Sequence, residues 1–467
     1  MEINGLMKNV NNYASNKFNL FAPIDINTGY KKAHTVTARP ISNTNSNGPY
    51  NFEFGATPDK FTDAKSLELC GRVRIIERKK NSTDIQTLTV NDNVSTINNI
   101  FHSLYSSIDV YVNDLLITLI TDPSSNWYSF RSYIERLLTF SKNTKVVNLS
   151  ASGYFQDTHK QYDVMSNDND GWKKRRLMFT SGEWVDFKEL LQVDLATAKR
   201  YLPPNIRIKV TLHRNSDEFC LLMADSITKQ YEIQLDELQM NLVKYDPDDE
   251  LMNYHLKEMQ ISTPIIPFDR SFIKTFTVQK GTSDLSRYNI INGQQLPEQI
   301  YVMMVDETSY IGILSILIIF IKSTNKILFT GAKNKNPFNF KNNDMDKCYL
   351  LVNGEREPLN PIRFDASNNR TRAAYSSLLQ SVGIDNYDDR DIGLNLYDFI
   401  NGCFIIGFDR TIDKCNRFHT HPMSGGSIDL YLKLHTNLTE SIRVIVYSSY
   451  SSYLTFDKNY NAYTQGF

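Results

Sequence analysis

The feature that most constrains the fold is a strict alternation of apolar and polar residues, which recurs along this chain of 467 residues. The clearest stretch is 206–213, which reads IRIKVTLH, and the stretches 428–434 (IDLYLKL) and 442–447 (IRVIVY) follow the same pattern. Successive side chains of a β-strand point to opposite faces, so a period of two predicts strands with one buried and one solvated face. Strands of that kind are typical of antiparallel sheets. The sequence therefore predicts a mostly β protein.

Local signals predict a hairpin and a bulge. Asn113-Asp114 follows one alternating stretch and precedes a second apolar one, which predicts a hairpin turn. Within 231–242 the apolar residues change parity, because Leu235 is followed by Leu238 instead of an apolar residue at 237. A change of parity inside one strand predicts a β-bulge.

Short helices are predicted between the strands. Helical spacing of apolar residues, or a charged linker composition, marks four stretches: 127–138, 187–201, 246–255 and 371–382. Pro203-Pro204 ends the second of these, because proline lacks the backbone N–H that a helix needs. Gly383 ends the last one, since glycine readily takes the left-handed conformation found after a helix.

The chain is too long for one ordinary hydrophobic core and suits two domains of about 200 residues each. Both halves combine many short strands, a short helix and long turn-rich loops, although no repeat of fixed period is visible. This pattern predicts two tandem antiparallel jelly-roll sandwiches, a double jelly roll, with short helices in the loops. The expected divisions are an extended N-terminal arm (1–60), a first jelly roll (61–245), a connector (246–262), a second jelly roll (263–457) and a C-terminal tail (458–467).

Composition narrows the functional classes. The 51 Lys and Arg against 52 Asp and Glu give a net charge of −1, so sequence-specific nucleic-acid binding is not expected. The five cysteines are dispersed and the N-terminus has no apolar signal core, which predicts free thiols in a reducing compartment, cytosol or nucleus. The apolar run 311–321 is about half of the ~20 residues that a spanning helix needs. It is interpreted as a buried strand, and no membrane span is predicted.

Motifs that carry chemistry are scarce. No phosphate-binding loop, G-x-S-x-G or H-E-x-x-H pattern occurs. Cys415, His419 and His421 form a metal-like grouping, because an H-x-H pair on a jelly-roll strand is similar to the cupin pattern. Cupins need a glutamate three or four residues further on, where this chain has Ser424 and Gly425. The grouping is interpreted as a polar loop, and no catalytic, cofactor-binding or metal-binding residue is predicted.

The run 172–176 (WKKRR) is the clearest basic segment. Such a run can act as a nuclear import signal or contact phosphate. Runs of this kind are more often solvated loops, and that interpretation is preferred here.

The order of short motifs in both halves resembles a known family. The second half contains, in order, NPFNF (336–340), CYLLV (348–352), NG (353–354), EPL (357–359), NG (401–402) and GFDRT (407–411). The first half contains IDVYVN (108–113), YSFR (128–131) and then a helix with Glu135, Leu137 and Leu138. In this order, and across nearly the whole chain, the stretches resemble the major capsid proteins of Polinton (Maverick) elements and adintoviruses.

The resemblance implies a double jelly roll of the adenovirus-hexon lineage and a structural protein, not an enzyme. It implies homotrimers that form pseudo-hexagonal capsomers of an icosahedral shell, with neighbouring capsomers and a penton or minor capsid protein as partners. It also implies a location in the virion, after synthesis in the host cytoplasm and with assembly in the nucleus as one option. The expected absence of an active site is consistent with a shell protein, which needs complementary surfaces.

One segment departs from the family pattern. The family runs almost directly from the strand at 301–305 through a glycine into NPFNF, whereas residues 313–330 intervene here. We hypothesise that 313–330 is an extra insertion, for example a translated intron. Full pairing and burial of 316–320 inside the second sandwich would contradict that hypothesis.

Two other functions remain open from the sequence. A tandem β-sandwich with aromatic loops would also suit a jelly-roll attachment protein that binds glycans, such as a spike, although secretion features are absent. A cupin-like enzyme is the second, and the missing carboxylate after His421 counts against it.

Overall fold

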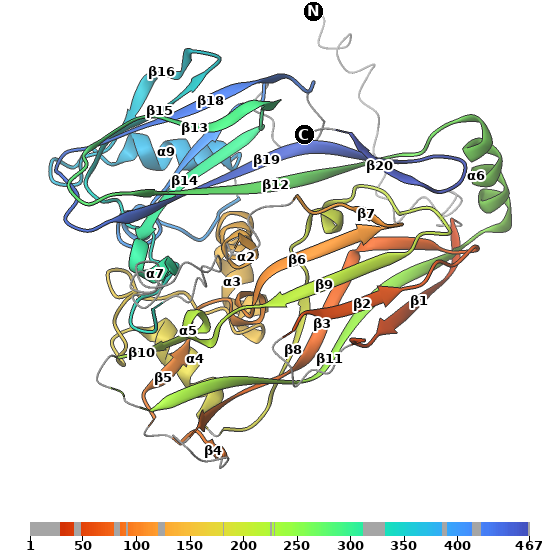
Figure 1. Ribbon diagram of the computed structural model, residues 1–467, viewed down its shortest axis with the longest axis horizontal. Coiled ribbons are helices and arrows are strands. Elements are labelled where there is room, and N and C mark those ends of the chain that lie inside the picture. Colours follow the sequence, from red (N-terminus) through yellow and green to blue (C-terminus); the bar gives the residue numbers. More distant parts are fainter. Residues whose placement is uncertain are drawn as a thin grey trace, which may run out of the picture.

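The computed structural model describes residues 29–41, 48–78, 85–89, 92–119, 127–180, 182–224, 227, 229–311, 332–384, 390–412 and 422–465. Within these residues the chain forms two antiparallel β-sandwiches, one from each half (Figure 1). Helices α2 (Trp127–Thr139) and α3 (Lys142–Ala151) lie between the two sandwiches, and α6 (Asp249–Ile261) connects them at one end. The fold is thus mostly β, as the alternation predicted.

The first half contributes eight main strands to two sheets: β1 (Tyr30–Ala38), β2 (Tyr50–Phe54), β3 (Phe61–Arg78), β6 (Tyr105–Val112), β7 (Leu115–Leu116), β8 (Val185–Leu190), β9 (Ile208–Arg214) and β11 (Gln230–Pro247). One sheet has the order β1-β11-β3-β8, and the other has the order β2-β9-β6-β7. Three short strands complete this half: β4 (Ile85–Thr87), which also pairs with β3, and the pair β5 (Val94–Thr96) and β10 (Leu221–Met223).

The second half also contributes eight main strands: β12 (Ile265–Val278), β13 (Asp284–Gln295), β14 (Gln299–Asp306), β15 (Met345–Val352), β16 (Glu355–Arg363), β17 (Ile405–Asp409), β18 (Gly425–Leu434) and β19 (Ile442–Phe456). Its sheets have the orders β12-β19-β14-β17 and β13-β18-β15-β16. In both halves the sheets therefore read first-eighth-third-sixth and second-seventh-fourth-fifth. Eight strands paired in this order form a jelly roll, and the chain is a double jelly roll.

The remaining helices fill the loops at matching places in the two halves. Between the fifth and sixth strands lie α2, α3 and α4 (Asp170–Phe179) in the first half, and α9 (Arg372–Ser381) and α10 (Leu396–Ile400) in the second. The shorter helices are α1 (Ile100–Ser103), η3 (Asp194–Thr197), α5 (Asp217–Cys220) and α7 (Glu307–Ile311).

Several local predictions are confirmed. Asn113 and Asp114 both have positive φ, as a tight hairpin between β6 and β7 requires. The predicted bulge lies in β11, where the register with β3 shifts between Asp236 and Gln239. Gly383, with φ of 72°, follows α9.

The helix predicted over 187–201 is wrong. Residues 185–190 form β8, which pairs with β3, and only η3 is helical in this stretch. Phe187 and Glu189 are buried while the residues between and beside them are more exposed, which is the period of a strand. Pairing with β3 therefore decided the structure of this stretch over the helical spacing of its apolar residues.

The expected arm and tail overlap with paired strands. β1 and β2 lie within 1–60 and are the first two strands of the first jelly roll, so that boundary was placed too late. The stretch 458–467 contains β20 (Ala462–Gln465), which pairs with β19. β1 and β20 bury few side chains, so their sequences lack the apolar alternation of a half-buried strand. β2 does alternate, with Tyr50, Phe52 and Phe54 buried, and it was overlooked.

Some predictions fall on residues outside the described ranges. These are the proposed insertion at 313–330, nearly all of the apolar run at 311–321, and the grouping of Cys415, His419 and His421. Within the described part of the chain, no helix is long and apolar enough to cross a membrane.

Candidate functional site

The junction between the two jelly rolls contains buried aromatic, polar and charged side chains that the sequence analysis did not predict. Its centre is the NPFNF stretch, residues 336–340, which belongs to the second half and is called the plug here. Phe338 is fully buried and stacks on Tyr133 of α2, with ring centroids 4.1 Å apart. It meets Phe130 and Phe219 edge-on, at 5.6 and 6.3 Å. Burying such a ring stabilises by about 1.5–3 kcal/mol, and aromatic pairs add ~0.5–1.5 kcal/mol.

The asparagines of the plug form hydrogen bonds with the first half. The backbone N–H of Asn336 donates to Asp163 Oδ1 (2.8 Å), and its side-chain amide donates to Asp157 Oδ2 (2.9 Å). The Asn339 amide donates to Asp163 Oδ2 (2.7 Å). Buried polar groups of this kind are costly unless paired, so these hydrogen bonds select one orientation of the plug.

Asp157 is the centre of this polar contact. It forms an ion pair with Arg175 of α4 (2.5 Å) and accepts a further hydrogen bond from the Asn169 amide (2.9 Å). Arg175 is fully buried and Asp157 is 4% exposed. A buried pair of charges is weak evidence for stability, but removal of one partner leaves an uncompensated buried charge. The pair therefore makes the junction sensitive to single substitutions.

This geometry corrects the interpretation of the basic run 172–176. The run is part of α4 and not a solvated loop. Trp172 and Arg175 are buried, while Lys173 and Lys174 are exposed. Burial of Arg175 removes this arginine from the set of charges that a nuclear import receptor or a phosphate could reach.

A second buried charge cluster joins α2 to the second half. Arg131 forms ion pairs with Asp194 and with Glu135 (2.8 Å). Asp194 accepts from the backbone N–H of Ser271 on β12 (3.1 Å), and Glu135 accepts from the Tyr447 hydroxyl on β19 (3.0 Å). Burial raises the pKa of Glu135, although Arg131 beside it opposes that shift. Both carboxylates thus link the halves through hydrogen bonds.

A third cluster lies within the first half. Arg136 donates to His102 Nε2 (2.8 Å), while His102 Nδ1 lies 2.8 Å from the Tyr128 hydroxyl. A guanidinium can only donate, so Nε2 must accept and His102 is neutral with its proton on Nδ1. Burial and the charge of Arg136 lower the pKa of His102 to about 4. Arg136 also forms an ion pair with Glu189 of β8.

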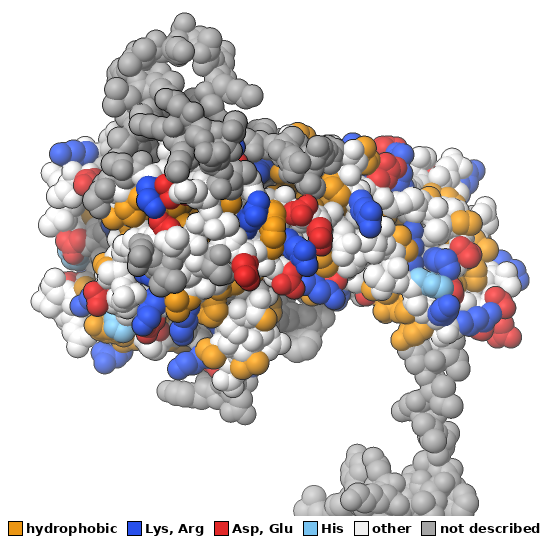
Figure 2. Space-filling view, turned by 90° about the horizontal axis from the view of Figure 1, so that it is seen from below, with side chains coloured by type: hydrophobic (Ala, Val, Ile, Leu, Met, Phe, Trp, Pro, Cys, Tyr) orange, Lys and Arg blue, Asp and Glu red, His pale blue; other side chains and the backbone are white. Residues whose placement is uncertain are grey.

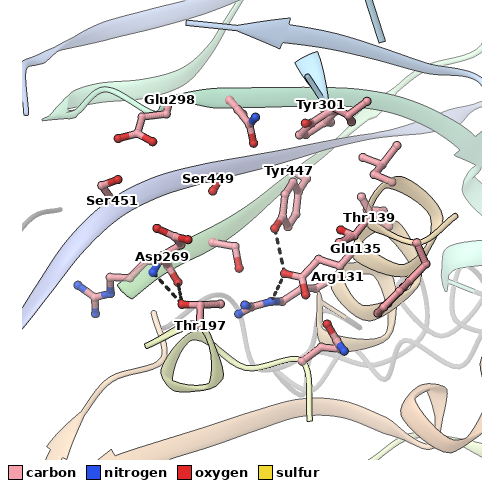
Figure 3. Close-up of a pocket in the computed structure, with 18 of the residues that line it drawn as sticks. Arg131, Glu135, Thr139, Thr197, Asp269, Glu298, Tyr301, Tyr447, Ser449 and Ser451 are labelled. Carbon is pink, nitrogen blue, oxygen red and sulfur yellow. Dashed lines mark hydrogen bonds and ion pairs between the residues drawn. The ribbon is translucent and has the colours of Figure 1, made fainter. Parts of the chain in front are cut away.

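A polar cavity of about 470 Å³ lies beside the second cluster, between α2 and the sheet formed by β12, β19 and β14 (Figure 3). We call it the interdomain pocket. Its walls combine three carboxylates and three basic side chains with hydroxyl and amide groups: Glu135, Asp269, Glu298, Arg131, Lys199, Arg270, Thr139, Thr197, Ser271, Ser449, Ser451, Tyr301, Tyr447, Gln192 and Gln299. It has no counterpart among the sequence predictions, because it draws on residues more than 300 positions apart.

The described residues contain no cluster of three or more His, Cys, Asp or Glu that could hold a metal ion. On the face shown in Figure 2, basic and acidic side chains of the described residues are interspersed. The predictions of no catalytic, cofactor-binding or metal-binding residue stay predictions.

No model of a known protein family matches the chain. The chain is 22% identical to "Uncharacterized protein F54H12.2" of Caenorhabditis elegans over 418 residues, which is 88% of this chain and 91% of that protein. A chain in the cryo-EM structure of the Sputnik virophage superposes with a TM-score of 0.63 at 11% identity, over 96% of this chain and 91% of the other.

The crystal structure of the mavirus major capsid protein superposes with a TM-score of 0.51 at 11% identity, over 98% of this chain and 94% of the other. The chain has the same fold as that capsid protein. The similarity spans nearly the whole chain, so it covers both jelly rolls.

Proposed function

We propose that this chain is a viral major capsid protein, a structural subunit that forms homotrimeric, pseudo-hexagonal capsomers of an icosahedral shell. The observation that carries the proposal is the same strand order in both halves, in an arrangement shared over nearly the full length with the mavirus major capsid protein. In this proposal the chain is not an enzyme, and its function depends on the surfaces through which it contacts other subunits.

The internal duplication gives a physical reason for a trimer. Three copies that each present two similar sandwiches place six similar units around one axis, which gives near-sixfold packing from threefold symmetry. Such a capsomer needs a fixed angle between the two sandwiches of each copy. The plug and the buried charge clusters supply that rigidity, because they cross from one half to the other at several places.

The source of the protein is a second part of the proposal. The motif order resembles capsid proteins of Polinton (Maverick) elements and adintoviruses, and the relative in Caenorhabditis elegans is encoded in an animal genome. A capsid gene carried by an integrated element would have such relatives. We propose the virion as the location, neighbouring capsomers and a penton or minor capsid protein as partners, and synthesis in the host cytoplasm.

The test is the mass of the purified full-length protein, measured by light scattering after size exclusion over a range of concentrations. A trimer has about three times the 53.9 kDa of one chain, and larger closed particles would be visible by electron microscopy. The same sample in denaturant gives the mass of a single chain as control. A protein that stays monomeric at high concentration would contradict the proposal and favour the attachment-protein alternative.

A further inference from the structure

The floor of the interdomain pocket is built from small side chains. Ser449 and Ser451 of β19 point to the same face of the sheet, since they are two residues apart. Ser271 and Asp269 of β12 are their direct neighbours across the strands, and Gln299 of β14 lies opposite Ser449 on the other side. Serine at both positions of β19 leaves a hollow between the sheet and α2, and its volume of about 470 Å³ lies in the range of small-molecule sites.

The charges of the pocket disfavour a strongly charged ligand. Three carboxylates face three basic side chains, so the lining has no net charge. Arg131 is paired with Glu135, and Lys199 with Asp269 at 3.5 Å. An anion would meet the unpaired carboxylate of Glu298, and a cation would meet the three basic side chains of the lining. A neutral ligand avoids both repulsions.

Several polar groups of the lining are left for a ligand. Among the described residues, the side chains of Glu298, Ser449, Ser451, Gln192 and Thr139 have no hydrogen-bond or ion-pair partner. Figure 3 shows Glu298, Ser449 and Ser451 on one side of the cavity and Thr139 on the other. A carboxylate only accepts hydrogen bonds, whereas a hydroxyl donates and accepts, so this set suits a ligand with several hydroxyl groups.

Apolar side chains complete the lining. Leu138 near the end of α2, Phe140 just after that helix and Val382 after α9 line the cavity together with the polar groups. A sugar ring presents hydroxyls at its rim and C–H groups on its faces, which matches a pocket with polar and apolar walls. We propose that the interdomain pocket binds a neutral carbohydrate of one or two sugar rings. This binding site goes beyond the proposed shell role and does not depend on it.

The first measurement is saturation-transfer NMR on the purified full-length chain with a panel of neutral sugars: glucose, galactose, mannose and N-acetylglucosamine. Transfer to at least one of these sugars is expected, and N-acetylneuraminic acid serves as the charged comparison. Absence of transfer to every neutral sugar, or transfer to N-acetylneuraminic acid alone, overturns the proposal.

Two substitutions test whether the sugar binds in this pocket. Glu298→Gln keeps the shape of the side chain but removes the charged acceptor, and Ser451→Phe fills the hollow. Each should weaken binding at least tenfold, since hydrogen bonds to charged groups contribute more than neutral ones. Glu237→Gln is the matched control, because Glu237 is an exposed carboxylate on β11 that does not line the cavity, and its pair with Arg72 is exposed as well. Unchanged thermal unfolding confirms that each variant is folded, and sugar binding that survives both pocket substitutions overturns the assignment.

Discussion

The two jelly rolls share one strand order, but the helices in their loops pack through different kinds of side chain. In the second half, α9 packs on β17 through small and apolar residues, and Gly407 leaves room for Ser381, whose Oγ would lie 2.0 Å from an added Cβ. In the first half the matching helices bury charges, among them Arg131 and Arg175. Helices α9 and α10 bury no charged side chain, so the buried charges of the first-half helices serve another purpose than packing a helix on its sandwich.

That purpose is visible in what the charges contact. Asp157 reaches the plug through Asn336, and Asp194 and Glu135 reach β12 and β19. These contacts tolerate little change in geometry, because a buried charge that loses its partners destabilises the fold. We infer that the helices of the first half bury charges because they set the angle at which the second half docks. The predictions below test this difference between the halves, from the largest expected effect to the smallest.

Truncation of the plug should have the largest effect. Phe338→Ala removes a fully buried ring that packs on both α2 and α5, and the expected loss is roughly 3–5 kcal/mol of the free energy of unfolding. The two jelly rolls should then unfold in separate transitions in a calorimeter. Phe364→Ala is the matched control, since Phe364 is equally buried but packs on Phe404 within the second half. A single shared transition in both variants would show that the plug does not couple the halves.

Removal of one buried charge should have the next largest effect. Asp157→Asn leaves Arg175 buried without its counter-ion, so we expect a loss of roughly 3 kcal/mol, measured by urea unfolding. The double variant Asp157→Asn with Arg175→Met has no buried charge left at this place. It should recover part of the loss, and a double variant that is no more stable than Asp157→Asn alone would contradict this account.

Acid should weaken the first half through His102. This imidazole is neutral in the folded chain, with a pKa of about 4, against 6.5 for an unperturbed histidine. The unfolded chain therefore binds more protons below pH 6.5, and stability is lost as the pH falls from about 6.5 to about 4. The loss from this group should be about 2–3 kcal/mol. His102→Gln, which cannot titrate, should flatten this part of the profile of stability against pH. An unchanged profile would contradict the prediction.

The sequence predicted individual strands better than the contacts between segments that lie far apart in the chain. Alternation located β9 and β18 because each strand carries its own pattern of burial. The same reasoning failed for β8, whose structure depends on pairing with β3 more than 100 residues earlier in the chain. It also could not find the burial of Arg175 or the interdomain pocket, since both depend on how distant segments meet. The NPFNF stretch stood out only as part of a resemblance, and its role as a plug required the fold.

The smallest effect should come from the connector. α6 has no buried residue, and Ile261 at its end is 81% exposed, so the connector joins the halves covalently but packs little against them. Ile261→Ser should change the free energy of unfolding by less than about 0.5 kcal/mol, measured in urea at a concentration where the protein is monomeric. A loss of several times that size in the monomer would mean that α6, and not the junction, fixes the halves. A loss that appears only at higher concentration would instead show that Ile261 becomes covered when copies of the chain associate.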